Sequence, residues 1–218
     1  MDGYIARALD LATLLEKNTV FLFGPRQTGK SSYVRQQLGE TVDRTYNLLD
    51  QGLLRRLLAD PTLLRQELVA RKFQDRVVCI DEVQKCPALL DEVHLLIEEQ
   101  GLRFLLTGSS ARRLHQKGSN LLGGRGRDRV MRPLTWHELG PKFDLLRAFR
   151  TGLIPSHYLA EDPEDALDSY VAGVPWRAVE QGPVYRANRR RWYSRTFWAM
   201  RRWKGPLSPS RLQRSNAS

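Results

Sequence analysis

A short segment with two glycines, Gly24 to Ser31, constrains the fold more than any other part of this sequence. It reads Gly-Pro-Arg-Gln-Thr-Gly-Lys-Ser and fits the pattern G-x-x-x-x-G-K-[ST] at every position. Such a segment joins a buried strand to a helix, and its backbone N–H groups point at phosphate oxygens. A chance match in a chain of this length is expected roughly once in a hundred sequences. The segment therefore predicts a phosphate-binding loop.

The flanking residues have the pattern that such a loop needs. Thr19 to Phe23 is a short apolar run rich in β-forming residues, and Ser31 to Leu38 is helical in pattern. We expect Lys30 to supply positive charge to the β- and γ-phosphates, and the Ser31 hydroxyl to bind Mg²⁺. The predicted ligands are ATP and Mg²⁺, and the predicted nucleotide contacts are Gly24, Pro25, Arg26, Gln27, Thr28, Gly29, Lys30, Ser31 and Ser32.

A second functional pattern is an apolar run, 76–80, that ends in two carboxylates, Asp81 and Glu82. In proteins with such a loop, the strand beside the loop delivers an aspartate to the Mg²⁺ ion. A glutamate directly after it can polarise the attacking water as a general base. We predict Asp81 and Ser31 as metal ligands and Glu82 as the catalytic base. The alternative is that Asp81 and Glu82 are only the solvated end of a strand. Glu82 favours a hydrolase over a small-molecule kinase without deciding between them.

Strands and helices alternate along the first two thirds of the chain, which predicts an α/β fold: a mainly parallel sheet between two layers of helices. The expected strands are 19–23, 45–49, 76–80 and 102–106. The expected helices are 4–17, 31–38, 53–71 with a break at Pro61, 88–99, a short stretch from Trp136, and one beginning within 161–170. Residues 123–129 are expected to form a Gly/Arg-rich loop.

Polar residues beyond the fourth expected strand are further candidates. Thr107 or Ser109 could contact the γ-phosphate or the attacking water, because ligands bind at this edge of such sheets. Capping of the next helix is an equally weighted alternative. Arg125, in a glycine loop, could stabilise transition-state charge in its own subunit or in a neighbouring one. We interpret Arg127 and Arg129 as solvated side chains.

The net charge of +11 is concentrated in one stretch of the chain. Residues 181–218 contain ten Lys/Arg and no Asp/Glu, whereas residues 1–180 are nearly balanced. Three of the five tryptophans, Trp192, Trp198 and Trp203, lie in the same stretch. Such a composition suits nucleic-acid binding by phosphate neutralisation and base stacking, through residues 181–218 only. The polar end also predicts disorder.

Several classes of protein do not match the sequence. No apolar run is long enough to cross a membrane, and the N-terminus has no secretory signal pattern, so we expect a cytoplasmic protein without a membrane partner. The two cysteines, Cys79 and Cys86, do not form a disulfide framework or a zinc motif, and the four histidines do not cluster.

Five blocks in this order resemble one family: GPRQTGKS, VVCIDEVQKCPALLDEVH, RFLLTGSSAR, LLGGRG and PLTWHELG. Over about residues 4–170 the chain resembles the prokaryotic AAA-type ATPases that combine an N-terminal P-loop domain with a C-terminal domain of unknown function. The resemblance implies a P-loop NTPase fold with an additional strand and a catalytic glutamate. It places Ser109 in the sensor segment and Arg125 in the glycine-arginine block. It names no client.

The sequence departs from that family near Val171, where it turns basic and rich in tryptophan. We interpret the second domain as truncated or replaced, as a shifted reading frame would produce. The expected organisation is a P-loop ATPase domain at 1–135, a helical segment at 136–172 and a basic tail at 173–218. The leading functional hypothesis is an ATPase, with a homo-oligomer or protein client as partner. An ATP-gated binding module with little turnover and nucleic-acid binding through the tail are the alternatives.

Overall fold

The computed structural model describes residues 4–71, 73, 76–109, 122 and 126–173. Within them lies a five-stranded sheet in which every pairing is parallel. The strand order is β2-β3-β4-β1-β5. The carboxyl ends of parallel strands meet at one edge, so the residues after β1, β3 and β4 come together there. The strands are β1 (Thr19–Phe23), β2 (Val42–Asn47), β3 (Val77–Asp81), β4 (Arg103–Gly108) and β5 (Gly126–Val130).

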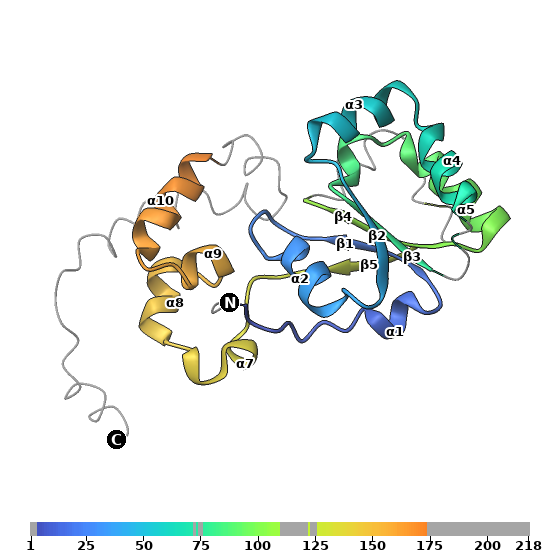
Figure 1. The fold of residues 1–218 in the computed structure, drawn as a ribbon. Coiled ribbons are helices and arrows are strands. Elements are labelled where there is room, and N and C mark those ends of the chain that lie inside the picture. Colours follow the sequence, from blue (N-terminus) through green and yellow to red (C-terminus); the bar gives the residue numbers. More distant parts are fainter. Residues whose placement is uncertain (1–3, 72, 74–75, 110–121, 123–125, 174–218) are drawn as a thin grey trace, which may run out of the picture. The chain divides into compact units, whose positions relative to one another are not determined.

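Helices cover both faces of the sheet and give the three-layer α/β fold that the sequence predicts (Figure 1). Alternate residues of β1 enter opposite cores: Val20 and Leu22 pack on one side, and Phe21 and Phe23 on the other. The first face carries α1 (Ala12–Leu15) and α2 (Lys30–Gln37). The second face carries α3 (Gln51–Ala59), α4 (Thr62–Ala70) and α5 (Leu89–Gln100), so the break expected at Pro61 is confirmed.

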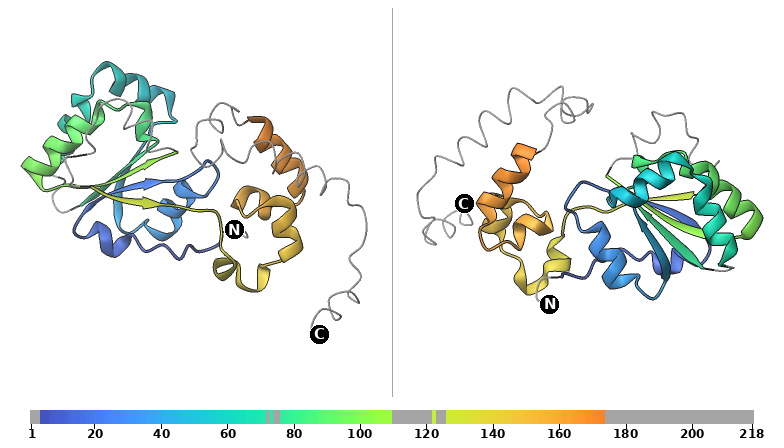
Figure 2. Two further views of the ribbon diagram at one scale, coloured as in Figure 1. Left: turned by 180° about the vertical axis from the view of Figure 1, so that it is seen from behind. Right: turned by 45° about the horizontal axis from the view of Figure 1, so that its top comes forward.

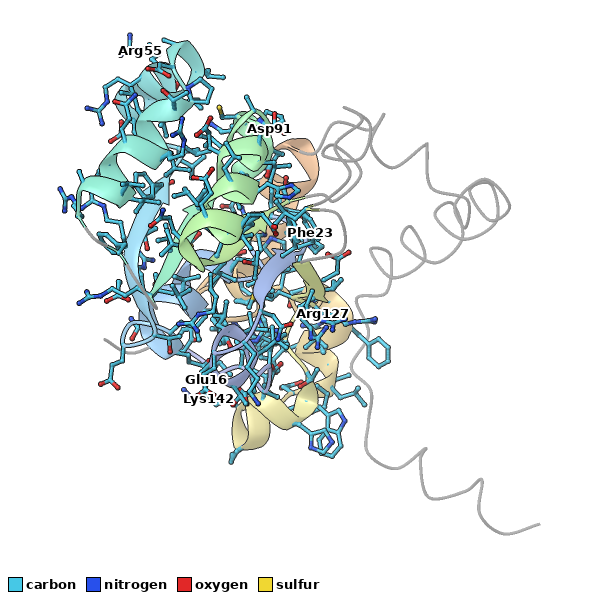
Figure 3. All side chains as sticks on the ribbon, turned by 90° about the vertical axis from the view of Figure 1, so that its right-hand side faces the viewer. Glu16, Phe23, Arg55, Asp91, Arg127 and Lys142 are labelled. Carbon is cyan, nitrogen blue, oxygen red and sulfur yellow. The ribbon has the colours of Figure 1, made fainter. Side chains whose placement is uncertain are left out.

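Three sequence expectations about these elements are wrong. The helix expected at 4–17 is reduced to Ala12–Leu15, and residues 4–11 are not helical. Part of the loop expected at 123–129 is strand β5, an edge strand with mostly exposed side chains. Its Arg127 and Arg129 are exposed, and Figure 3 shows Arg127 extending outward from the edge. The Asp81 strand does not lie beside the loop strand, because β4 lies between β3 and β1 and pairs with both.

Short helices follow the sheet, as expected from Trp136 onward (Figure 2). They are α7 (Trp136–Leu139), α8 (Leu145–Thr151), α9 (Pro155–Tyr158) and α10 (Pro163–Gly173). A small separate core, built around Leu134, Leu139 and Tyr158, holds the first three together. Residues up to Leu167 belong to one compact unit of the chain, which contains the sheet and these first three helices. Among the helices of the described residues, none is long and apolar enough to cross a membrane.

Candidate nucleotide site

The predicted phosphate loop leaves β1 between the ends of β4 and β5. Gly24 donates its N–H to the carbonyl of Gly108 at 3.3 Å, and a Cβ on Gly24 would lie 2.4 Å from the carbonyl oxygen of Met131. A side chain at this position would therefore push the loop off the sheet. Gln27 and Gly29 have positive φ angles of 63° and 88°, which turn the backbone toward the start of α2.

Lys30 is buried at the base of this loop, with 6% of its surface exposed. Its ammonium donates to the carbonyl oxygens of Gly24 at 2.7 Å and Pro25 at 2.9 Å. Burial lowers the pKa of Lys30, and the carboxylates of Glu82 and Asp81 oppose that shift. The ammonium is thus within electrostatic range of both carboxylates, and it must exchange its carbonyl partners to reach a phosphate group.

The buried carboxylate of Asp81 is the centre of a hydroxyl–carboxylate cluster with the buried Thr107 and the exposed Ser31. The Ser31 hydroxyl donates to Asp81 Oδ2 at 2.7 Å, and the Thr107 hydroxyl donates to Asp81 Oδ1. Thr107 is fully buried on β4, between the loop strand and β3, and its oxygen also accepts the N–H of Glu82 at 3.4 Å. A hydroxyl and a carboxylate beside a phosphate loop are the hard oxygen donors that Mg²⁺ prefers, so Ser31 and Asp81 fit that ion.

Glu82 follows β3 with a left-handed backbone, φ 62°, and begins a 3₁₀ turn over Val83–Lys85. The side-chain amide of Gln84, within this turn, donates to Glu82 Oε2 and to the Ser109 hydroxyl at 3.3 Å. The Gln84 Oε1 atom is buried and has no hydrogen-bond partner among the described residues. Gln84 therefore links the carboxylate to the end of β4. Sequence reasoning missed it, because nothing local distinguishes a glutamine two residues after the acidic pair.

The structure brings most predicted site residues to one edge of the sheet. Lys30, Ser31, Asp81, Glu82 and Ser109 lie within one network of hydrogen bonds and charges, which Thr107 and Gln84 complete. Pro25, Arg26 and Gln27 are exposed on the loop, and Ser32 follows on α2. Arg125 and the helix expected after Ser109 lie outside the described residues. The catalytic roles remain predictions.

Distant parts of the chain contact the loop at Gln27 and at Thr28. The side-chain oxygen of Gln27 accepts hydrogen bonds from the Ser156 hydroxyl at 2.7 Å and from His157 Nε2 at 3.1 Å, both on α9. The guanidinium of Arg7 donates to the carbonyl of Thr28 at 2.8 Å. Sequence reasoning missed these contacts, because they join residues more than twenty positions apart.

A comparison with protein families matches residues 16–140, more than half of the chain, to the family described as AAA domain. No curated protein matches the chain. Among solved structures, the ADP form of the Aeropyrum pernix ORC2 protein is similar, with 16% sequence identity and a TM-score of 0.41. That match covers 64% of this chain and 53% of the other, so this chain spans about half the length of that protein.

Proposed function

Because the chain belongs to the AAA domain family, we propose that it binds Mg²⁺-ATP on the 24–31 loop and hydrolyses the bond between the β- and γ-phosphates. The observation that carries this proposal is the contact between the Ser31 hydroxyl and Asp81, 2.7 Å, at the start of the helix that follows the loop. A hydroxyl and a carboxylate meet where the terminal phosphates of a nucleotide on the loop would lie.

The chain's own residues supply the binding interactions. The loop amides and the N-terminus of α2 provide N–H donors and a positive dipole for the phosphates. Lys30 adds a positive charge. When the nucleotide binds, its ammonium leaves the carbonyl oxygens of Gly24 and Pro25 and donates to phosphate oxygens instead. Ser31 and Asp81 would hold Mg²⁺, which supplies Lewis-acid stabilisation of phosphate charge when bound.

Glu82 is the proposed general base. Its carboxylate accepts the proton of the attacking water as the water oxygen bonds to the γ-phosphorus and the bond to the β-phosphate oxygen breaks. The amide of Gln84 donates to this carboxylate and to Ser109, so it orients the base relative to the end of β4. The buried Thr107 hydroxyl holds the adjacent Asp81.

Mg²⁺-dependent ATP binding and turnover of the full chain test this function. We expect Lys30→Ala to abolish both binding and turnover, because the phosphates lose the buried ammonium at the base of the loop. Glu82→Gln should keep binding and lower turnover by a factor of about 10²–10⁴, the usual contribution of a general base. Two matched controls, Lys17→Ala and Glu99→Gln, change exposed residues away from the loop and should behave as the parent does.

The outcomes separate the possible functions. Turnover that survives in Glu82→Gln would remove this residue from the mechanism. A parent chain that binds no ATP would contradict the proposal as a whole.

An ATP-gated binding module with little turnover is a second candidate, and the bond between Gln84 and Glu82 favours it. A carboxylate that is already hydrogen-bonded to an amide is a weaker base for water. In that case the parent would bind ATP tightly and turn it over slowly, and Gln84→Ala would raise turnover. A fall in turnover in Gln84→Ala would instead assign Gln84 to orienting the base.

Nucleic-acid binding through residues 181–218 is a third candidate, which depends on the ten cations of that stretch alone. It predicts affinity for single-stranded nucleic acid that falls steeply with salt and disappears when these residues are deleted. Affinity that survives the deletion would contradict it.

A further inference from the structure

The segment of residues 4–11 is not helical, yet side chains of α2 hold it in place. The side-chain oxygen of Gln37 accepts the N–H of Arg7 at 2.6 Å, and its amide donates to the Arg7 carbonyl at 3.1 Å. The hydroxyl of Tyr33 donates to the Leu9 carbonyl at 2.8 Å. The helix that follows the phosphate loop therefore fixes the backbone of Arg7.

The guanidinium of Arg7 bonds to four residues in three other parts of the chain. It donates to the carbonyls of Thr28 at 2.8 Å, Arg132 at 2.6 Å and Pro133 at 3.2 Å, and to the carboxylate of Glu138 at 3.0 Å. The side chains of Arg7 and Glu138 are each only 6% exposed. Arg7 therefore joins the loop, at Thr28, to the segment 132–138.

Glu138 provides the charge that such a buried cation requires. One carboxylate oxygen accepts Arg7 and the N–H of Ala8 at 2.9 Å, and the other accepts the N–H and hydroxyl of Thr135 at 2.8 and 3.0 Å. Burial would raise the pKa of Glu138, but the hydrogen bonds from Ala8, Arg7 and Thr135 outweigh it and hold the pKa below its usual value. Glu138 also completes the capping box of α7.

We propose that Arg7 is a positioning residue for the phosphate loop: it holds the Thr28 carbonyl outward, so that the loop N–H groups stay directed at the nucleotide. Glu138 neutralises it and connects the loop to the segment after β5. This inference rests on the proposed nucleotide binding. It assigns a role in the site to a residue whose partner lies 131 positions away along the chain.

The competing explanation is that the ion pair only stabilises the fold. Two substitutions separate the two explanations, because Glu138→Gln keeps the bond between Arg7 and Thr28, whereas Arg7→Met removes it. A double variant, Arg7→Met with Glu138→Gln, removes both charges and leaves no buried charge unpaired. The glutamine keeps a side-chain acceptor for the Ala8 and Thr135 donors and for the capping box of α7. Breaking a buried ion pair on one side alone is more costly than removing both charges.

The test measures the Kd for Mg²⁺-ATP, the KM and kcat of turnover and the thermal unfolding of each full-length variant. Loss of a partner that orients a metal ligand typically weakens metal binding roughly 10- to 100-fold, and we take the same order for a residue that orients the loop. We therefore expect Arg7→Met to raise Kd and KM by about that factor, with a smaller change in kcat. Glu138→Gln should lower the unfolding temperature while Kd stays within about threefold. The double variant should regain stability and keep the weak binding.

A matched control is Arg44→Met, which breaks the Arg44–Glu67 ion pair (2.9 Å) on β2, the opposite edge of the sheet from β5. It should leave Kd unchanged. Parental affinity in Arg7→Met would overturn the proposal, and so would a double variant that regains affinity together with stability.

Amide hydrogen exchange of the protein without nucleotide tests the role of Arg7 independently of whether the protein binds ATP. Amides of the 24–31 loop should exchange faster in Arg7→Met than in the parent, while amides of β3 and β4 keep their protection. If the parent binds no ATP, the proposed function fails, and the exchange rates still decide whether Arg7 positions the loop. Unchanged loop exchange in Arg7→Met would overturn the inference.

Discussion

Replacing Thr107 by valine tests the hydrogen-bonded centre of the candidate site. Thr107 is fully buried, and its hydroxyl donates to Asp81 and accepts the N–H of Glu82. Valine has nearly the same shape as threonine, so Thr107→Val removes the hydrogen bonds without opening a cavity. The buried carboxylate of Asp81 then keeps only the Ser31 hydroxyl among the partners described here.

The magnitude follows from the two bonds. A hydrogen bond to a charged group contributes about 1.5–3 kcal/mol, and leaving its partner unsatisfied is costly. The bond from the Glu82 N–H, at 3.4 Å, is long and contributes little. We therefore expect Thr107→Val to lower the free energy of unfolding by about 2 kcal/mol. In a chain of this size that corresponds to roughly 4–8 °C in the unfolding temperature.

Thr107→Ser is the matched control, because it keeps the hydroxyl and loses one buried methyl group, about 1 kcal/mol. The free energy of unfolding of all three proteins is measured by urea unfolding, followed by circular dichroism. Equal dependences of that free energy on urea concentration would show that the three proteins expose the same surface on unfolding. Ser109→Ala should change stability by less than about 0.5 kcal/mol, since Ser109 is half-buried and its hydroxyl accepts a weak bond, 3.3 Å, from Gln84. If Thr107→Ser is less stable than Thr107→Val, side-chain volume dominates and the hydrogen-bond argument is wrong.

Three further substitutions test other parts of the structure. Gly24→Ala should abolish ATP binding measured by calorimetry, because the added Cβ would lie 2.4 Å from the carbonyl oxygen of Met131. Gly52→Ala is the control: its Cβ would contact only the side chain of Asp50, and the variant should bind ATP normally. Burial lowers the pKa of His157 in the folded state, so on acidification the unfolded state binds a proton at a higher pH than the folded state does. The contribution of His157 to the free energy of unfolding should therefore be complete above about pH 6.5 and decrease as the pH falls below it. His157→Gln should flatten that pH dependence in unfolding experiments, and an unchanged slope would contradict this. Asp50→Ala removes the N-cap of α3 and should lower the free energy of urea unfolding by about 1 kcal/mol; no change would show that water replaces the cap.

Much of the sheet could be predicted from local patterns. The strands 19–23, 76–80 and 102–106 were identifiable because buried parallel strands are short, apolar and bounded by polar or glycine residues. The strand expected at 45–49 is instead the edge strand β2, which spans Val42–Asn47 and has mostly unburied side chains. Strand β5 has the opposite composition, Gly-Arg-Asp-Arg-Val, and its side chains are mostly exposed. It is a strand because its backbone pairs with β1, a partner that no local pattern reveals.

The N-terminal segment shows the same limit. Its apolar spacing suits a helix, but the backbone of residues 7–11 bonds to Gln37, Tyr33 and Glu138 instead of forming helical turns. Tertiary contacts that satisfy buried backbone groups outweigh a helical preference of a few tenths of a kcal/mol per residue, on the order of the known propensities.

The sequence by itself determined the candidate chemistry of this protein: a predicted phosphate loop, its lysine and serine, and an acidic pair, because each depends on residue types at fixed local spacing. Only the tertiary structure decided that β4 lies between β1 and β3 and places Thr107 on Asp81, that Gln84 meets Glu82 and Ser109, and that Arg7 reaches both Thr28 and Glu138. The reason is physical. Buried polar groups must find partners, and a compact chain brings those partners together from positions that are far apart in the sequence.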